Sequence, residues 1–153
     1  MQDETPTVLF VSASPQDHES LGAALEGSRW RLESARTFSE ARLVLQLRPV
    51  SVLITERLLP DGLSWKNLAG EIAGNLYVPI VVVAPRAVAE RLSEEVLADG
   101  GFDVLGRPSS RAELLRMLSA AWRFGEDRRA LAGRPSRRSG PRVMGGLLGG
   151  AQA

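Results

Sequence analysis

The sequence predicts an α/β protein built on a five-stranded parallel sheet with helices on both faces. Short apolar runs alternate with segments of helical periodicity five times along the chain. The connections between them are short, as in sheets whose strands are joined by crossover helices. Two runs, VSVLITE at 50–56 and PIVVVA at 79–84, are rich in apolar, β-branched residues, which is typical of strands buried on both faces.

The first part of the chain predicts two strands, each followed by a helix. The strands are TVLFVS at 7–12 and WRLESA at 30–35. Ser14 is a good N-cap for the first helix, and Asp17 is placed to complete a capping box with it. A second amphipathic helix is expected between residues 37 and 49, where proline ends it.

The organising strand comes third and ends in a single carboxylate, Glu56. Later elements are a helix at 64–76, a strand at 79–84, a helix at 87–98, a strand at 102–107 and a helix that Ser109 or Ser110 caps and that runs to Leu131. Five strands in a domain of this size fit the flavodoxin-like order 2-1-3-4-5. The first and third strands then flank the switch point, so Ser12 and Glu56 are expected side by side at the carboxyl edge.

Composition excludes several classes of function. The 153 residues contain no cysteine and one histidine, His18, which excludes disulfides, thiolate metal sites and multi-histidine metal sites. No apolar run reaches the length of a membrane span, and acids stand where a signal peptide carries basic residues. No nucleophile–base pair or phosphate-binding glycine loop is visible. We therefore expect a cytoplasmic protein that is not an enzyme and uses no cofactor.

Charge and composition divide the chain into a short lead at 1–5, a domain at 6–131 and a tail at 132–153. The tail is rich in glycine, arginine and proline and is expected to be disordered. Residues 133–153 hold four arginines and no acid, a charge of +4, so residues 1–132 carry −3 of the net +1. Arginines of this kind can contact nucleic acid, but no stacking aromatics or DNA-binding unit accompany them, so neither nucleic acid nor membrane is the favoured partner.

Several local motifs resemble the receiver domain of bacterial response regulators over roughly residues 5 to 128. The most specific is Glu56-x-x-Leu59-Pro60-Asp61-Gly62, which is similar to the Asp-x-x-(Leu/Met)-Pro-Asp-Gly run after the third strand of that family. Arg107-Pro108 stands where the family has Lys-Pro. The run 79–84 stands where it has a proline-led apolar strand that ends in Thr or Ser. The resemblance implies a signalling module of two-component systems.

The chemical positions of that family are altered here. In the family, two acids after the first strand and an Asp after the third bind Mg²⁺, and the Asp accepts a phosphoryl group from a histidine kinase. The resemblance places the acid pair on Ser12 and Ala13, and the phosphoacceptor on Glu56. The residues that contact the phosphoryl group fall on Ala84 and Arg107, and a reporting aromatic falls on Val104.

These replacements predict a degenerate receiver that works without phosphorylation. Mg²⁺ needs several oxygen ligands, and without Mg²⁺ phosphoryl transfer loses its main charge stabilisation. We expect no metal at this site and a fixed Glu56–Arg107 ion pair in place of the phosphate, because arginine can bind a carboxylate in a bidentate manner. Two simpler interpretations stay open: Glu56 is a solvated strand-end acid, and Arg107 pairs with Asp103 instead.

The last helix has a second apolar flank formed by Met117, Ala120 or Ala121, Phe124 and Leu131. Of the two alanines, Ala121 is the one assigned to this flank. Receiver-like proteins commonly dimerise or bind partners through their fourth and fifth helices, so this flank is a possible interaction face. The alternative is that it only broadens the core. The expected partner is another signalling protein, related to histidine kinases or not, or a second copy of the chain. The rival functions are a phosphorylatable receiver that uses Glu56 with weak Mg²⁺ binding, and a nucleic-acid-associated signalling protein that uses the arginine-rich tail.

Overall fold

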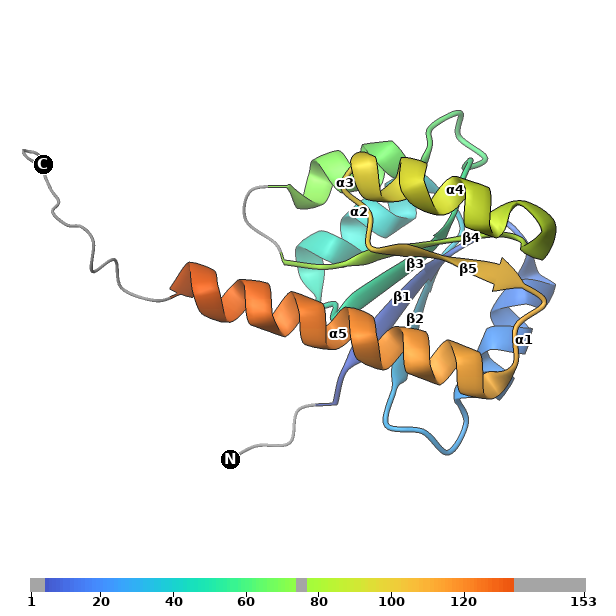
Figure 1. The fold of residues 1–153 in the computed structure, drawn as a ribbon, viewed down its shortest axis with the longest axis horizontal. Helices are drawn as coiled ribbons and strands as arrows, with labels where there is room; N and C mark the ends of the chain where they lie inside the picture. Colours follow the sequence, from blue (N-terminus) through green and yellow to red (C-terminus); the bar gives the residue numbers. More distant parts are fainter. Residues whose placement is uncertain (1–4, 74–76, 134–153) are drawn as a thin grey trace, which may run out of the picture.

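The computed structural model describes residues 5–73 and 77–133 of the chain (Figure 1). Five strands alternate with five helices in this part: β1 Thr7–Val11, α1 Pro15–Leu25, β2 Arg31–Ala35, α2 Phe38–Leu47, β3 Val52–Glu56, α3 Trp65–Ile72, β4 Ile80–Pro85, α4 Arg86–Ala98, β5 Asp103–Arg107 and α5 Arg111–Gly133. None of the helices described is long and apolar enough to cross a membrane.

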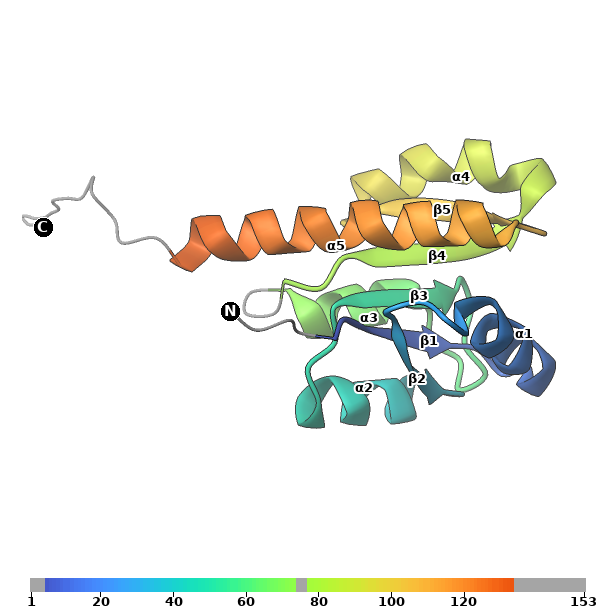
Figure 2. The ribbon, with the colours of Figure 1, turned by 90° about the horizontal axis from the view of Figure 1, so that it is seen from below.

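All strand pairs are parallel, and the order in the sheet is β2-β1-β3-β4-β5. Figure 2 shows the strands in this sequence, from β5 near the top to β2 near the bottom. The register sets Val8 beside Val52 and Ile54 beside Val81, so the apolar runs occupy the middle of the sheet. The predicted fold class and strand order are confirmed.

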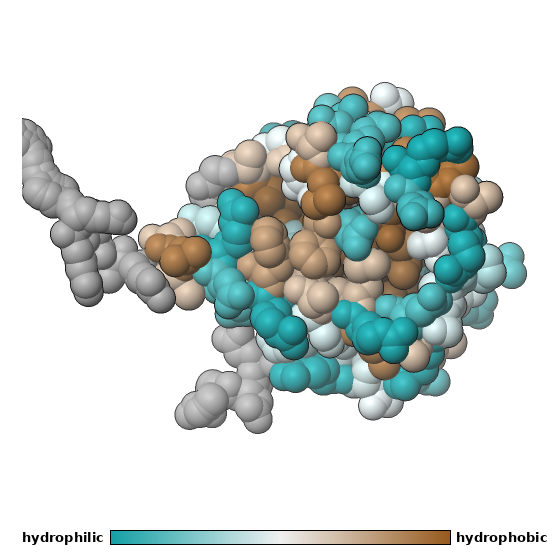
Figure 3. Space-filling model, viewed as in Figure 1, coloured by the Kyte–Doolittle hydropathy of each residue, from teal (hydrophilic) through white to brown (hydrophobic). Residues whose placement is uncertain are grey.

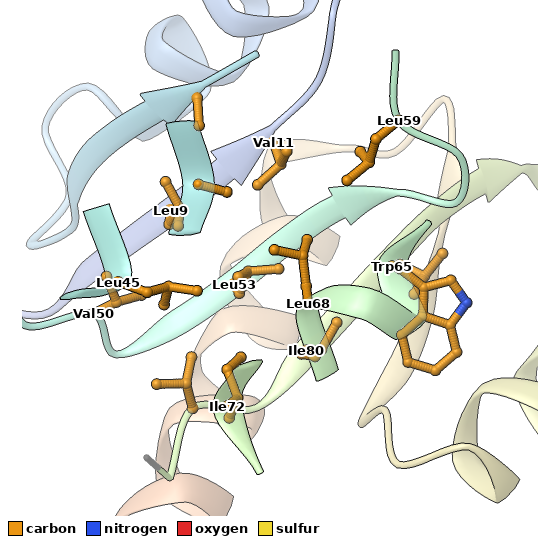
Figure 4. Packing of buried hydrophobic residues seen from close by; sticks show 14 of the residues in the cluster. Leu9, Val11, Leu45, Val50, Leu53, Leu59, Trp65, Leu68, Ile72 and Ile80 are labelled. Carbon is orange, nitrogen blue, oxygen red and sulfur yellow. The ribbon is translucent and has the colours of Figure 1, made fainter. Parts of the chain in front are cut away.

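Two apolar cores lie on opposite faces of the sheet. One joins the strands to α2, α3 and α4, with Trp65, Leu68 and Val96 at most 1% exposed (Figure 4). The other joins them to α1 and α5, with Leu25, Leu114 and Leu118 buried. Successive side chains of a strand point to opposite faces, so each strand contributes to both cores. This explains why the central strands have no polar face.

The ends of the elements follow the expected signals with small differences. Ser14 and Thr37 accept hydrogen bonds at the starts of α1 and α2, as the capping pattern predicts. The fourth helix begins at Arg86, one residue earlier than expected, because β4 passes into α4 without a loop. The third helix ends at Ile72 with Ala73 as its C-cap, four residues before the expected end at 76. The last helix continues to Gly133, two residues into the segment 132–153 that was expected to be a disordered tail. Residues 74–76 and 134–153 lie outside the described part.

Candidate functional site

Glu56 lies at the carboxyl end of β3, beside the residues that follow β1. Its carboxylate accepts a hydrogen bond of 3.0 Å from the Ser12 hydroxyl. Ser12 is completely buried, and its oxygen also accepts the Ser14 N–H at 3.1 Å. The hydroxyl is thus held as both donor and acceptor, which is how buried polar groups are satisfied. The parallel order β1–β3 brings Ser12 and Glu56 together, although 44 positions separate them in the sequence.

Arg107, at the end of β5, reaches Glu56 from the far side of β4. Its Nη2 donates to both Glu56 oxygens, at 3.3 and 3.4 Å. The expected bidentate pair would use two guanidinium nitrogens, one for each oxygen, whereas here a single nitrogen contacts both oxygens. Its Nη1 donates to Asp17 Oδ2 at 2.8 Å, which is the shorter contact. We call Asp17, Glu56 and Arg107 the charge cluster.

Asp17 belongs to the charge cluster, whereas the sequence pattern predicts that its carboxylate caps the first helix. The expected capping box is not formed, because the Ser14 N–H donates to Ser12 instead. The Asp17 backbone N–H donates to the Ser14 hydroxyl. The Asp17 carboxylate, which is not used as a cap, accepts from Arg107. The other candidate partner of Arg107, Asp103, accepts hydrogen bonds from the Ser93 hydroxyl and the Val104 N–H.

The three other positions singled out by the receiver resemblance, Ala13, Ala84 and Val104, carry no ionisable group. Ala84 and Val104 are buried, at 4% and 6% exposure, and Ala13 is exposed. Within residues 5–73 and 77–133, no three acids, cysteines or histidines are grouped so that they could hold a metal ion. The two carboxylates of the charge cluster, Glu56 and Asp17, are both bound by Arg107.

His18 supports the turn that carries Ser12. Its Nε2 lies 2.8 Å from the Ser12 carbonyl oxygen and its Nδ1 lies 3.1 Å from the Ser34 hydroxyl. The ring also packs against Phe10, with centroids 4.7 Å apart. These contacts give the only histidine of the chain a positioning role beneath the site.

Comparison with known proteins supports the fold of this chain. No protein-family model and no curated protein sequence matches it. Solved structures do. A chemotaxis response regulator of Vibrio cholerae is similar at 18% identity with a TM-score of 0.64, over 77% of this chain and 99% of that one. A signal receiver domain of an HD domain-containing protein from Pseudomonas fluorescens is similar at 20% identity with a TM-score of 0.73, over 85% of this chain and 96% of that one.

A third similar structure is the receiver domain of a sensor histidine kinase from Pseudomonas aeruginosa, which holds magnesium in its active-site cleft. It is 22% identical with a TM-score of 0.66, over 78% of this chain and 98% of that one. This chain has the receiver fold of response regulators. The charge cluster stands at the carboxyl edge of the sheet, where open α/β folds bind their ligands.

The loop after β3, which is the most receiver-like stretch of the sequence, ties β3 to α2. Asp61 accepts hydrogen bonds from the Phe38 and Ser39 N–H groups, at 3.2 and 3.3 Å. Burial acts to raise the pKa of Asp61, but the hydrogen bonds from Phe38, its own N–H and Ser39 together outweigh burial and hold that pKa below its usual range. Gly62 has a φ of +82°, which suits glycine in this turn.

A second tie joins the start of α4 to the start of α5 in this receiver fold. Arg86 donates to the Pro108 carbonyl oxygen from Nε and Nη2, at 3.2 and 2.7 Å, and to Glu113 at 3.0 Å. The Ser110 N–H lowers the pKa of Glu113 most, burial opposes this, and Arg86 lowers it further. Arg86 therefore links the β4–α4 junction to the connection after β5.

The surface between α4 and α5 differs in part from the expected interaction face. Ala121 is completely buried against the sheet, so it does not belong to the surface; the helical turn directs the neighbouring Ala120 outward instead. Met117 is half-buried, and Phe124 is 43% exposed and contacts Phe102. Figure 3 shows an apolar hollow on this side, bordered by hydrophilic side chains.

The groove over β5 combines short, apolar and charged residues. Its lining consists of the short Ala89, Ser93, Gly106 and Ala120, the larger apolar Val104, Leu105 and Met117, and the charged Arg86, Glu90, Glu113 and Arg116. Its volume is about 680 Å³. We call this surface, together with Phe124, the α4–α5 face. Short side chains at the centre allow a partner element to approach the sheet edge closely.

Proposed function

We propose that the protein is a receiver-like signalling module that works without phosphorylation and acts through protein contacts. The charge cluster is the observation that carries this proposal. A receiver acid must be available to a metal ion and to a phosphoryl donor. Glu56 instead accepts hydrogen bonds from Ser12 and Arg107, and Arg107 is also bound to Asp17. The acid that would be modified is already hydrogen-bonded and ion-paired within the chain.

The missing metal ligands support the same proposal. Proteins usually hold Mg²⁺ with one or two carboxylates together with water and substrate phosphate, and Ser12 and Ala13 add no carboxylate to Glu56. Ala84 offers no hydroxyl to a phosphoryl oxygen. Val104 is buried and lacks the aromatic ring whose rotation commonly reports the state of a receiver.

NMR spectra of the full chain recorded with Mg²⁺ and beryllofluoride, a phosphoryl mimic, test the proposal. We expect no site-localised shifts in the natural sequence. The matched control is the variant Ser12→Asp, Ala13→Asp, Glu56→Asp, Ala84→Thr, Arg107→Lys, which supplies the absent groups and should gain Mg²⁺-dependent shifts around position 56.

Shifts around Ser12, Glu56 and Ala84 in the natural sequence would overturn the proposal. They would favour the rival function, a phosphorylatable receiver. Labelling by acetyl phosphate that disappears in Glu56→Ala would establish that rival. If neither the natural chain nor the substituted control responds to beryllofluoride, acetyl phosphate labelling of the natural chain decides between the two functions.

The output of such a module must come from a surface, and we assign it to the α4–α5 face. This face combines an apolar centre with a charged rim, the usual composition of protein interfaces. The favoured occupant is a separate signalling protein, and a second copy of the chain is the alternative. Sedimentation of the purified chain distinguishes the two, and Ala120→Glu should abolish either association.

Leu43→Glu is the matched control for the α4–α5 face. Leu43 is 55% exposed on α2, which belongs to a different part of the surface. We expect this variant to keep the association that Ala120→Glu removes. If both variants associate like the natural chain, the α4–α5 face is not the output surface.

A further inference from the structure

A cavity of about 550 Å³ opens between α1 and α5, next to the charge cluster. Figure 2 looks onto this face of the sheet, with α1 and the start of α5 both near the carboxyl ends of the strands. The floor of the cavity is apolar and is formed by Phe10, Leu21, Ile54, Val83, Leu105 and Leu114. Its volume falls within the range of pockets that enclose small organic molecules.

The cavity exists because α1 presents short side chains to α5 between two fixed ties. Positions 17, 20, 21 and 24 share one face of α1 by helical spacing, and Ser20 and Ala24 are too short to fill the gap. At the start of α1, Asp17 is bound to Arg107. At its end, Arg111 donates to the Ala24 and Glu26 carbonyl oxygens, at 2.9 and 3.1 Å. The two ties hold the helices at a set separation.

The rim of the cavity is polar and includes two cationic side chains. It contains Asp17, Arg107 and Arg111, together with the hydroxyls of Ser20 and Ser109. The two arginines and two carboxylates, counting Glu56, sum to zero charge. The N-terminus of the 23-residue α5 also lies at this point, and its partial positive charge is offset by the Glu113 carboxylate, which accepts the Ser110 N–H.

Arg107 has donors to spare. A guanidinium has five N–H donors, and the bonds from Arg107 to Asp17 and Glu56 use at most three of them. The Asp17 side chain is 36% exposed, so it can also turn to solvent and release Nη1.

We propose that this cavity binds a small amphipathic anion, with an apolar chain or ring on the floor and a carboxylate against Arg107. Such a ligand contacts Arg107, one of the three residues of the charge cluster. This inference goes beyond the proposed function, because binding requires neither a protein partner nor a phosphoryl group.

Titration of the full chain with octanoate, followed by NMR, tests the inference. We expect saturable one-to-one shifts at Leu21, Ala24, Arg107 and Leu114. Octan-1-ol and octylammonium share the apolar chain, and they should bind at least about tenfold more weakly because they lack the anionic acceptor. Equal affinity for octanoate and octylammonium, or shifts that do not saturate, would overturn it.

Two variants fill the cavity independently, so a folding defect in one does not remove the test. Ala24→Leu and Ser20→Leu should each weaken octanoate binding by about tenfold or more, since the added side chain takes the place of the ligand. Ala120→Leu, in the groove over β5, is the matched control and should leave binding unchanged. A folded filling variant that binds octanoate like the natural chain contradicts the inference. The beryllofluoride result is independent of all these outcomes.

Discussion

Individual polar residues of this chain are used mainly to fix loops at the carboxyl edge of the sheet. Asp61 and Thr37 together satisfy the three N–H groups that open α2, those of residues 38, 39 and 40. Helix starts leave such donors without partners, so a carboxylate placed there stabilises both the helix and its own loop. The Pro60-Asp61-Gly62 sequence is therefore explained by structure alone, without any phosphoryl chemistry.

The low pKa of Asp61 predicts a pH dependence of stability. A carboxylate whose pKa is lower in the folded state than its ordinary value of 3.8 stabilises the fold above that value, and the effect is lost as the pH falls through the folded-state pKa. Asp61→Asn should lower the free energy of unfolding at pH 7, and its difference from the natural chain should shrink as the pH falls below about 4. Urea unfolding across pH checks this.

Glu94→Gln is the control for Asp61→Asn, because it removes an exposed acid from the middle of α4, away from any helix start. It tests whether the loss of one negative charge alone changes stability. A difference between Asp61→Asn and the natural chain that stays constant from pH 7 to pH 3 would contradict the assigned role of Asp61.

At the scale of elements, the sequence predicted the order of all ten segments and whether each is a strand or a helix. Buried strands and amphipathic helices differ in period, and that difference survives in a single sequence. Contacts between distant elements were harder. Asp17 fits a local capping pattern, and only the fold shows Arg107, 90 positions away, as its partner. Ala121 lies between two apolar stripes of α5, so periodicity alone did not settle that it faces the core.

The close contact of α4 with β5 depends on Gly106. A Cβ atom at this position would lie 3.2 Å from Arg86 Cα and 3.3 Å from Ala89 Cβ. Gly106→Val should therefore push α4 away from β5 and lower the free energy of unfolding by about 1–3 kcal/mol. The matched control is Gly70→Ala, in α3, where nothing lies within 4 Å and helix propensity predicts a gain of up to about 1 kcal/mol. Urea unfolding measures both, and equal effects would contradict the contact.

At the scale of the whole molecule, one sheet carries two cores, and the candidate surfaces lie on its outer sides. The charge cluster joins β3 and β5 to the start of α1, and Arg86 joins α4 to α5. The cavity opens between α1 and α5, and the α4–α5 face lies around β5. A ligand or a partner at either place would contact elements that these ties already connect.

Because both cores share the same five strands, they should unfold as a single cooperative unit. The tryptophans report on them separately. Trp65 is buried on the α2–α4 side, whereas Trp30 and Trp122 contact each other on the α1–α5 side, with ring centroids 5.6 Å apart. In Trp65→Phe the remaining tryptophans, Trp30 and Trp122, report on the core of the α1–α5 side alone. In Trp30→Phe/Trp122→Phe the remaining Trp65 reports on the core of the α2–α4 side. In each variant the fluorescence midpoint in urea should coincide with that of its own circular dichroism. Separate midpoints within one variant would mean that the helices on one face detach while the sheet persists, and that the two faces are less coupled than their shared strands imply.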